Sequence, residues 1–167
     1  MLALGMIAAL AMPGTAQATP QLGDLGVKQS MSVKASNGES LEGKDLRAIQ
    51  LATYTAASVD GNTIVGYDLT TNTALASDIT AAAKAAGATD TNLTVNGKND
   101  PMVWVVKNLT DSRSDPWSGK LRNFCNSLAK QTNFDKQDGT AVSTRSQDKA
   151  TMSTGNVLVP GIYAIVD

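Results

Sequence analysis

The sequence has no histidine and only one cysteine, Cys125, among its 167 residues. Without histidine, Ser-His-Asp and Cys-His catalytic arrangements are excluded, as is every metal site that needs an imidazole ligand. A single cysteine allows neither an internal disulfide nor a thiolate metal site. Glycine-rich phosphate-binding motifs are absent as well. We therefore expect a protein that is not an enzyme and that uses no cofactor and no metal ion.

An excess of charge of one sign is also missing, because 14 Lys and Arg residues stand against 15 Asp and Glu residues. A surface that binds nucleic acid needs clustered basic side chains, and the lysines of this chain form no run. We therefore expect no nucleic-acid partner. The carboxylates are not clustered either. This disfavours an enzymatic alternative, an exported hydrolase with carboxylate catalysis.

The N-terminus carries the pattern of an export signal. An apolar run over residues 1–12 is ended by Pro13-Gly14, and the small residues Ala16 and Ala18 follow with one residue between them. This order is typical of a signal peptide that is cleaved after Ala18. The run is well short of the roughly 20 residues that a permanent membrane helix needs, and the rest of the chain has no such segment. A basic start is lacking, since the first basic residue is Lys28, and a buried N-terminal core helix is the alternative.

Three segments of the remaining chain predict β-structure. Residues 27–35 alternate between apolar and polar side chains, which indicates a half-buried strand. Residues 46–69 predict a β-hairpin whose turn is centred on Asp60-Gly61. Residues 156–167 form two apolar β-segments hinged at Pro160-Gly161, and the sequence stops inside the second segment.

The middle of the chain predicts helices, of which the first covers residues 75–88. This stretch is rich in alanine, the residue with the highest helix propensity. Ser77 or Asp78 is expected to cap its N-terminus, and Gly87 to end it.

Two further helices are expected over residues 100–109 and 118–131. Both repeat apolar residues at the i, i+3, i+4 and i+7 positions, and the first begins with an Asp-Pro pair. Cys125 lies on the apolar face of the later helix, where a small buried hydrophobic side chain is favoured over a reactive thiol. Trp104 and Trp117 lie near helix ends, where half-buried side chains covering the sheet are favoured over sugar stacking.

These elements predict the fold class and the domain organisation. Removal of the signal peptide, residues 1–18, leaves residues 19–167, the length of one ordinary domain. The order of strand, hairpin, helices and terminal strands predicts a mainly β domain of the α+β class. We expect an Ig-like β-sandwich with a helical insertion, whose C-terminal strands are incomplete.

The same series of motifs resembles the N-terminal domain of a sortase-assembled fimbrial major subunit of Gram-positive bacteria, in the isopeptide-forming pilin family. The likeness is to the actinobacterial branch and covers most of residues 27–167. Ile49 departs from it, because an aromatic residue is usual at that position. The matching segments are residues 41–54, 60–69, 101–104, 116–124 and 160–167.

The resemblance implies a structural subunit of a cell-wall pilus that is involved in adhesion. Its expected partners are neighbouring pilin subunits, host glycan or matrix protein, and sortase. The lysine of the pilin motif and the LPxTG-like sorting signal lie further downstream in that family and do not occur in this sequence. We therefore expect residues 19–167 to be the N-terminal module of a longer subunit. The alternative is a non-polymerising secreted or wall-attached adhesin domain that binds glycan or matrix protein.

The family often carries an intramolecular Lys–Asn isopeptide bond, and the resemblance implies one here. Such a bond needs a buried lysine of lowered pKa, an asparagine beside it and a protonated carboxyl group. Lys28 and Lys34 are the candidates by position on an early strand. Both fall on the polar side of that strand, so solvent-exposed lysines are the favoured interpretation.

Overall fold

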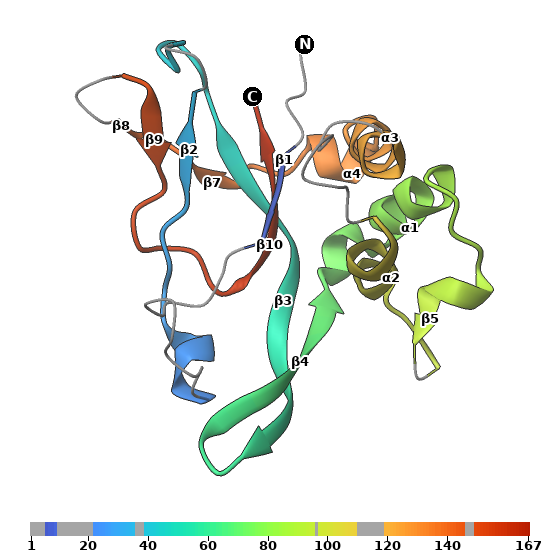
Figure 1. Ribbon diagram of the computed structural model, residues 1–167. Helices are drawn as coiled ribbons and strands as arrows, with labels where there is room; N and C mark the ends of the chain where they lie inside the picture. The colour runs from blue at the N-terminus through green and yellow to red at the C-terminus, as the bar shows by residue number, and fades with distance from the viewer. Residues whose placement is uncertain (1–5, 10–21, 36–38, 96, 110–118, 146–148) are drawn as a thin grey trace.

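The computed structural model describes residues 6–9, 22–35, 39–95, 97–109, 119–145 and 149–167. They form antiparallel sheets and short helices, which confirms the broad α+β class (Figure 1). The main sheet has the strand order β1–β10–β3–β4, and β7 also pairs with β3. Its strands are β1 (Met6–Ala9), β3 (Arg47–Asp60), β4 (Thr63–Thr71), β7 (Thr140–Ala141) and β10 (Gly161–Val166).

Smaller sheets and helices complete the described part of the chain. One small sheet has the order β2–β9–β8, and the other pairs β5 with β6. Their strands are β2 (Ser32–Lys34), β5 (Thr94–Val95), β6 (Lys98–Asn99), β8 (Thr144–Arg145) and β9 (Thr151–Ser153). The α-helices are α1 (Ala76–Ala85), α2 (Pro101–Asn108), α3 (Gly119–Leu128) and α4 (Thr132–Asp135). Short 3₁₀ turns are η1 (Leu22–Gly26), η2 (Thr73–Leu75) and η3 (Thr91–Leu93).

The hairpin expected over residues 46–69 is confirmed as β3 and β4. The two strands pair in antiparallel register as far as Asp60 and Thr63, so two residues make the turn. Gly61, the first of them, has a φ of 60°, which a side chain with a Cβ rarely adopts. A glycine at this place is typical of the type II′ turns that suit the twist of a hairpin.

Of the two β-segments expected over residues 156–167, the second is a strand, β10, and it lies inside the main sheet. The first is not a strand, because residues 156–159 form a turn and only the isolated bridge from Leu158 to Gln29. β10 runs antiparallel to β3 on one side and to β1 on the other. All four residues from Ile162 to Ile165 are buried, because both faces of this strand are covered. Ile162 and Ala164 belong to one apolar cluster, whereas Tyr163 and Ile165 belong to a second. Burial on both faces explains why this segment is continuously apolar and does not alternate.

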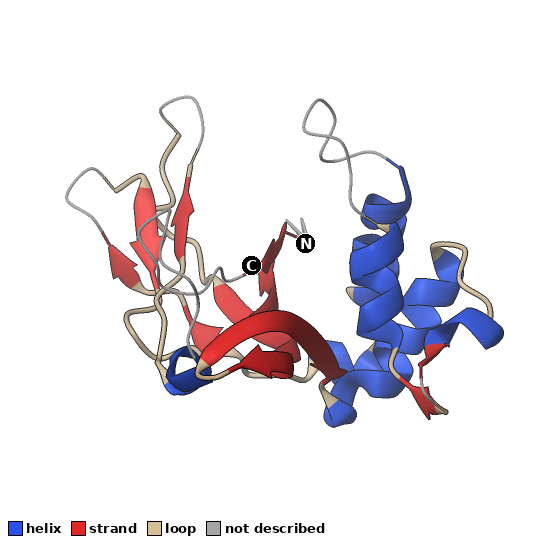
Figure 2. Ribbon diagram, turned by 60° about the horizontal axis from the view of Figure 1, so that its bottom comes forward, coloured by secondary structure: helices blue, strands red, loops and turns tan. Residues whose placement is uncertain are grey.

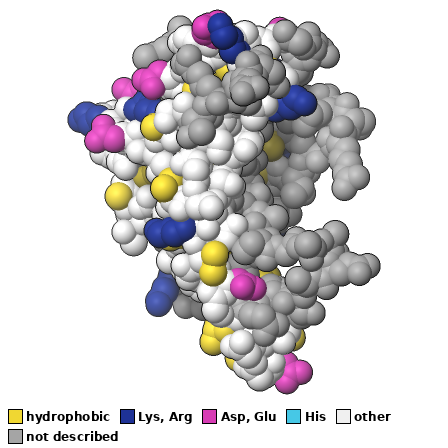
Figure 3. All heavy atoms as spheres, turned by 90° about the vertical axis from the view of Figure 1, so that its left-hand side faces the viewer, with side chains coloured by type: hydrophobic (Ala, Val, Ile, Leu, Met, Phe, Trp, Pro, Cys, Tyr) yellow, Lys and Arg dark blue, Asp and Glu magenta, His cyan; other side chains and the backbone are white. Residues whose placement is uncertain are grey.

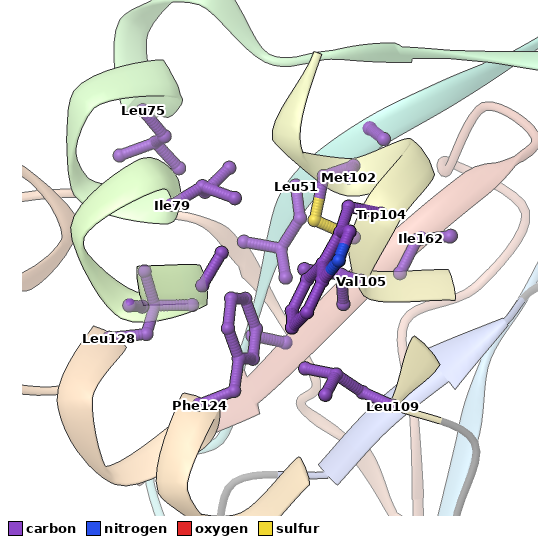
Figure 4. Packing of buried hydrophobic residues seen from close by; sticks show 14 of the residues in the cluster. Leu51, Leu75, Ile79, Met102, Trp104, Val105, Leu109, Phe124, Leu128 and Ile162 are labelled. Atoms are coloured by element: carbon purple, nitrogen blue, oxygen red, sulfur yellow. The ribbon is translucent and has the colours of Figure 1, made fainter. Parts of the chain in front are cut away.

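The first cluster, which we call the helix-side core, lies between the main sheet and the helices. Figure 2 shows the α-helices gathered to one side of the main sheet. Side chains from α1, α2 and α3 meet β3 and β10 in this core (Figure 4). Its fully buried members include Leu51, Leu75, Ile79, Met102 and Phe124.

The second cluster, which we call the sheet-side core, covers the other face of the main sheet. The β2–β9–β8 sheet lies on the side of β3 and β10 away from the helices (Figure 1). Val33 from β2 and Met152 from β9 pack there against Ala48, Tyr163 and Ile165 of the main sheet. The main sheet is therefore the middle layer between helices and a second, smaller sheet.

Two expectations for the N-terminal part differ from the structure. The strand expected over residues 27–35 is limited to β2, with an isolated bridge from Gln29 to Leu158. Val27 is 47% exposed and lies outside the sheet, so the apolar alternation covers more residues than the pairing. Within the expected signal peptide, Met6–Ala9 forms the edge strand β1. A core helix at these residues, the alternative considered above, is wrong.

The helical expectations hold except at the start of α1. Neither Ser77 nor Asp78 caps this helix, because it begins at Ala76 and its N-cap residue is Leu75. Asp78 is buried in the helix, and its carboxylate instead accepts hydrogen bonds from Asn133 Nδ2 and from the Phe134 backbone N–H. It thereby ties α1 to α4, a helix too short for sequence periodicity to predict.

Candidate binding pocket

The sequence-predicted site residues do not come together. Ala16 and Ala18, the expected cleavage site, lie outside the described residues. Lys34 is an exposed residue of β2, and Lys28 is exposed at the mouth of a cavity described below. Every lysine of the chain lies among the described residues, and every one is exposed. The buried lysine that isopeptide formation requires is therefore not provided by this part of the chain.

A cavity of about 290 Å³ lies beside the main sheet where two strands flank β3 without meeting. β7 pairs with β3 up to Ala48, whereas β4 pairs with it only from Ala52 onwards. Residues 49–51 of β3 are left between these two partners. We call this cavity the polar pocket, and its polar side chains are Lys28, Gln50, Asn72, Gln137, Thr140 and Tyr163.

A β-bulge in β3 positions Gln50 in the polar pocket. Ala52 pairs with Ile162 and Gln50 with Tyr163, so Leu51 is an extra residue opposite the junction. Leu51 and Ala52 both belong to the helix-side core, although they are neighbours in a strand. Bulges of this kind redirect side chains and are common next to functional sites. Here the bulge places the preceding residue, Gln50, opposite Tyr163.

Hydrogen bonds hold the inner side of the polar pocket in place. Gln50 Nε2 donates to the Tyr163 hydroxyl oxygen at 3.0 Å, and that hydroxyl donates to the Val159 carbonyl at 2.8 Å. Asn72 Nδ2 donates to the Gln50 carbonyl at 2.9 Å. Burial raises the pKa of Tyr163 to about 12, so its phenol stays neutral near pH 7. The inner side of the pocket is therefore polar, uncharged and fixed.

Gly139 forms another part of the wall, and its backbone approaches β3 closely. Its φ of 64° lies in the left-handed region that favours glycine. A Cβ at this position would lie 3.0 Å from the Ala48 carbonyl oxygen and 3.1 Å from Ile49 Cγ1. Only glycine fits this approach without displacing the neighbouring strand.

The charge of the polar pocket comes from Lys28. None of the residues that line the pocket carries a carboxylate. Arg47 lies behind the wall, where its Nη1 donates to the Gln137 carbonyl at 3.0 Å. On the face that Figure 3 displays, acidic and basic side chains are interspersed. The pocket can thus receive a polar ligand that is neutral or negatively charged.

Other chemical features of the described residues are few. They contain no group of three or more acidic, cysteine or histidine side chains that could hold a metal ion. No helix among them is long and apolar enough to cross a membrane. Cys125 is partly buried and packs against the helix-side core, as expected. Trp104 is 7% exposed in the same core, so it is more deeply buried than expected, whereas Trp117 lies outside the described residues.

Comparisons with known proteins identify no family for this chain. It matches no family model, no curated protein and no solved structure. The functional conclusion therefore depends on the residues and their arrangement.

Sequence reasoning missed the polar pocket. Gln50, Asn72 and Gln137 have no special spacing, and amide side chains occur on most protein surfaces. The Gln50–Tyr163 contact joins residues 113 positions apart. The sequence offers two signals, Pro160-Gly161 beside the neighbouring strand and the position of Lys28 near an early strand.

Proposed function

We propose that this chain is a non-catalytic structural module of a cell-surface pilus, the N-terminal part of a subunit that sortase polymerises. It is exported by its signal peptide and displayed on the cell wall. Its partners are neighbouring subunits, and sortase acts on segments downstream of residue 167. The family is the isopeptide-forming pilins of Gram-positive bacteria, of which this chain is proposed to be an actinobacterial-like member.

The observation that supports this proposal is the placement of three separate motifs. The segments 41–54, 60–69 and 160–167 resemble the pilin series in residue type. They supply β3, β4 and β10, and β3 lies directly between the other two. β3 and β4 pair as neighbours in sequence, so the position of the distant segment β10 beside β3 is what supports the proposal.

An Ig-like β-sandwich with a helical insertion is part of the proposal. Two observations support it among the described residues. The main sheet and the β2–β9–β8 sheet share the sheet-side core, as two layers of a sandwich do. The helices α1 to α4 all fall between β4 and β7 in sequence, which is the pattern of an insertion.

A second candidate function is a non-polymerising adhesin domain that binds glycan or matrix protein. The polar pocket favours it, because a fixed set of polar groups is the usual form of a site for a small polar ligand. The two candidates share export and surface display. They differ in whether the chain becomes part of a covalent polymer.

Polymerisation is tested by an immunoblot of cell-wall extracts from the native organism. The extracts are boiled in SDS and probed with antibody raised against residues 19–167. We expect a ladder of high-mass bands, because covalent links between subunits survive boiling. Extracts from a strain without sortase are the control, and there the ladder should collapse. A single band in the parent strain would contradict the pilus proposal and favour the adhesin.

A further inference from the structure

We infer that the polar pocket binds one acidic sugar unit and that Lys28 recognises its carboxylate. The inference goes beyond the pilus proposal and deepens the adhesin alternative. It does not require polymerisation, so the immunoblot and the binding experiment below fail independently.

The sign of the charge on the expected ligand follows from the charged side chains at the pocket. Lys28 is exposed at its mouth, and no lining residue supplies a carboxylate to neutralise it. Arg47 adds a second positive charge behind Gln137. Asp138 follows Gln137 in sequence and is exposed, but it is not among the lining residues. An anion at the mouth is therefore favoured over a cation.

The uncharged polar lining indicates that the rest of the ligand carries hydroxyl groups. Gln50 and Gln137 each use one amide N–H within the protein, toward the Tyr163 hydroxyl and the Asn133 carbonyl. Their amide oxygens can accept, and the Thr140 hydroxyl can donate and accept. Sugar hydroxyls also donate and accept, so they match such a lining better than a purely accepting or purely donating ligand. A peptide C-terminus would present a carboxylate with an apolar side chain. The polar lining would give that side chain few apolar contacts.

The size of the cavity limits the ligand to one unit. Pockets for drug-sized ligands begin at roughly 300 Å³. The polar pocket, at about 290 Å³, lies at this lower end. A single pyranose ring suits this volume, and a longer glycan would extend beyond the cavity.

The binding experiment is a titration of the isotope-labelled 167-residue chain followed by NMR. The ligand is glucuronate, and the comparison ligands are its neutral methyl ester and an acetylated dipeptide with a free carboxylate. We expect saturable shifts from glucuronate at Gln50, Thr140 and their neighbours. The ester should bind more weakly because it lacks the charge.

Two lysine variants separate specific recognition from general charge. Lys28→Gln should weaken glucuronate binding by up to about fivefold, the range for an exposed ion pair, and leave the ester unaffected. Lys34→Gln is the matched control, because Lys34 is also exposed but does not line the pocket. Its affinity should equal that of the parent chain.

A Gln50→Glu variant tests the inner side of the pocket. It retains the size of the side chain and places a carboxylate opposite that of the ligand, so glucuronate binding should fall more than tenfold. Well-dispersed spectra of each variant confirm that it is folded. The inference is overturned if glucuronate causes no saturable shifts, if the dipeptide binds as well as glucuronate, or if Lys34→Gln weakens binding as much as Lys28→Gln.

Discussion

The two faces of the main sheet are built differently. The helix-side core contains large side chains that are wholly buried, such as Phe124, Leu51 and Leu75. The sheet-side core is covered by the short strands β2, β8 and β9, and its members Met31 and Val33 remain slightly exposed to solvent. The polar pocket adjoins the sheet-side core through Tyr163. The helix side therefore buries the larger side chains, whereas the polar pocket adjoins the other core. We expect truncations to cost more stability on the helix side.

The largest expected effect comes from opening the helix-side core. Phe124→Ala should lower the free energy of unfolding by about 3–5 kcal/mol, because a fully buried aromatic ring leaves a cavity among tightly packed neighbours. Met31→Ala in the sheet-side core should cost nearer about 2 kcal/mol, the low end for such truncations. Urea unfolding of both variants measures the two values. An equal or larger cost for Met31→Ala would contradict the comparison.

A smaller effect is expected from the buried carboxylate that links α1 to α4. Asp78→Ala should cost about 2–3 kcal/mol, because the Phe134 N–H and the Asn133 amide lose a charged acceptor. Urea unfolding at neutral pH measures this loss. Asp78→Asn is the matched variant, since it retains the shape of the side chain and removes only the charge.

The same carboxylate gives the stability a pH dependence. Burial alone would raise the pKa of Asp78, but hydrogen bonds from Asn133, Phe134 and Ser77 outweigh it and hold the pKa below 3.8. A lowered pKa in the folded state adds stability that is present above pH 3.8 and is lost as the pH falls through the folded value. The difference in stability between parent chain and Asp78→Ala should therefore shrink in acid. A constant difference would show that the carboxylate charge contributes nothing.

The smallest expected effect is the extra cost that a Cβ contact adds in the wall of the polar pocket. Gly139→Ala should cost about 1–2 kcal/mol from the left-handed backbone and more from the contact with Ala48. Gly61→Ala is the matched control, because its φ of 60° is close to the 64° of Gly139 but no atom lies near its Cβ position. Thermal unfolding of both variants isolates the contact. Equal losses would mean that the wall accommodates a Cβ.

Much of the fold could be predicted from local patterns. The hairpin, α1 to α3 and the terminal strand have strong periodicity or propensity, and all of them are present. The errors arose where distant residues decide the outcome. The rule for N-caps favoured Ser77 or Asp78, but Asp78 is bonded to Phe134, which lies 56 residues away. The strand at β2 is short because β9 pairs with only three of its residues.

The polar pocket could not be predicted for a related reason. Gln50 enters it through a bulge, and a bulge has no sequence signal beyond a break in alternation. Leu51 and Ala52 do form such a break, but a buried strand has the same pattern. The sequence indicates Lys28 only as an isopeptide candidate, from its position on an expected early strand. The fold places this exposed residue among those that line the pocket, a position that depends on residues far away in sequence.

The position of β10 also has a consequence for how the chain folds. β10 lies between β1 and β3, yet it is synthesised after all the other strands of the sheet. The pairing between β3 and β10, which includes Arg47 with Val166, can therefore form only after the C-terminal segment has been made. Contacts between residues so far apart in sequence slow folding, since a long loop has to close first. The main sheet can therefore close only late in folding, once the C-terminal segment has docked beside β3.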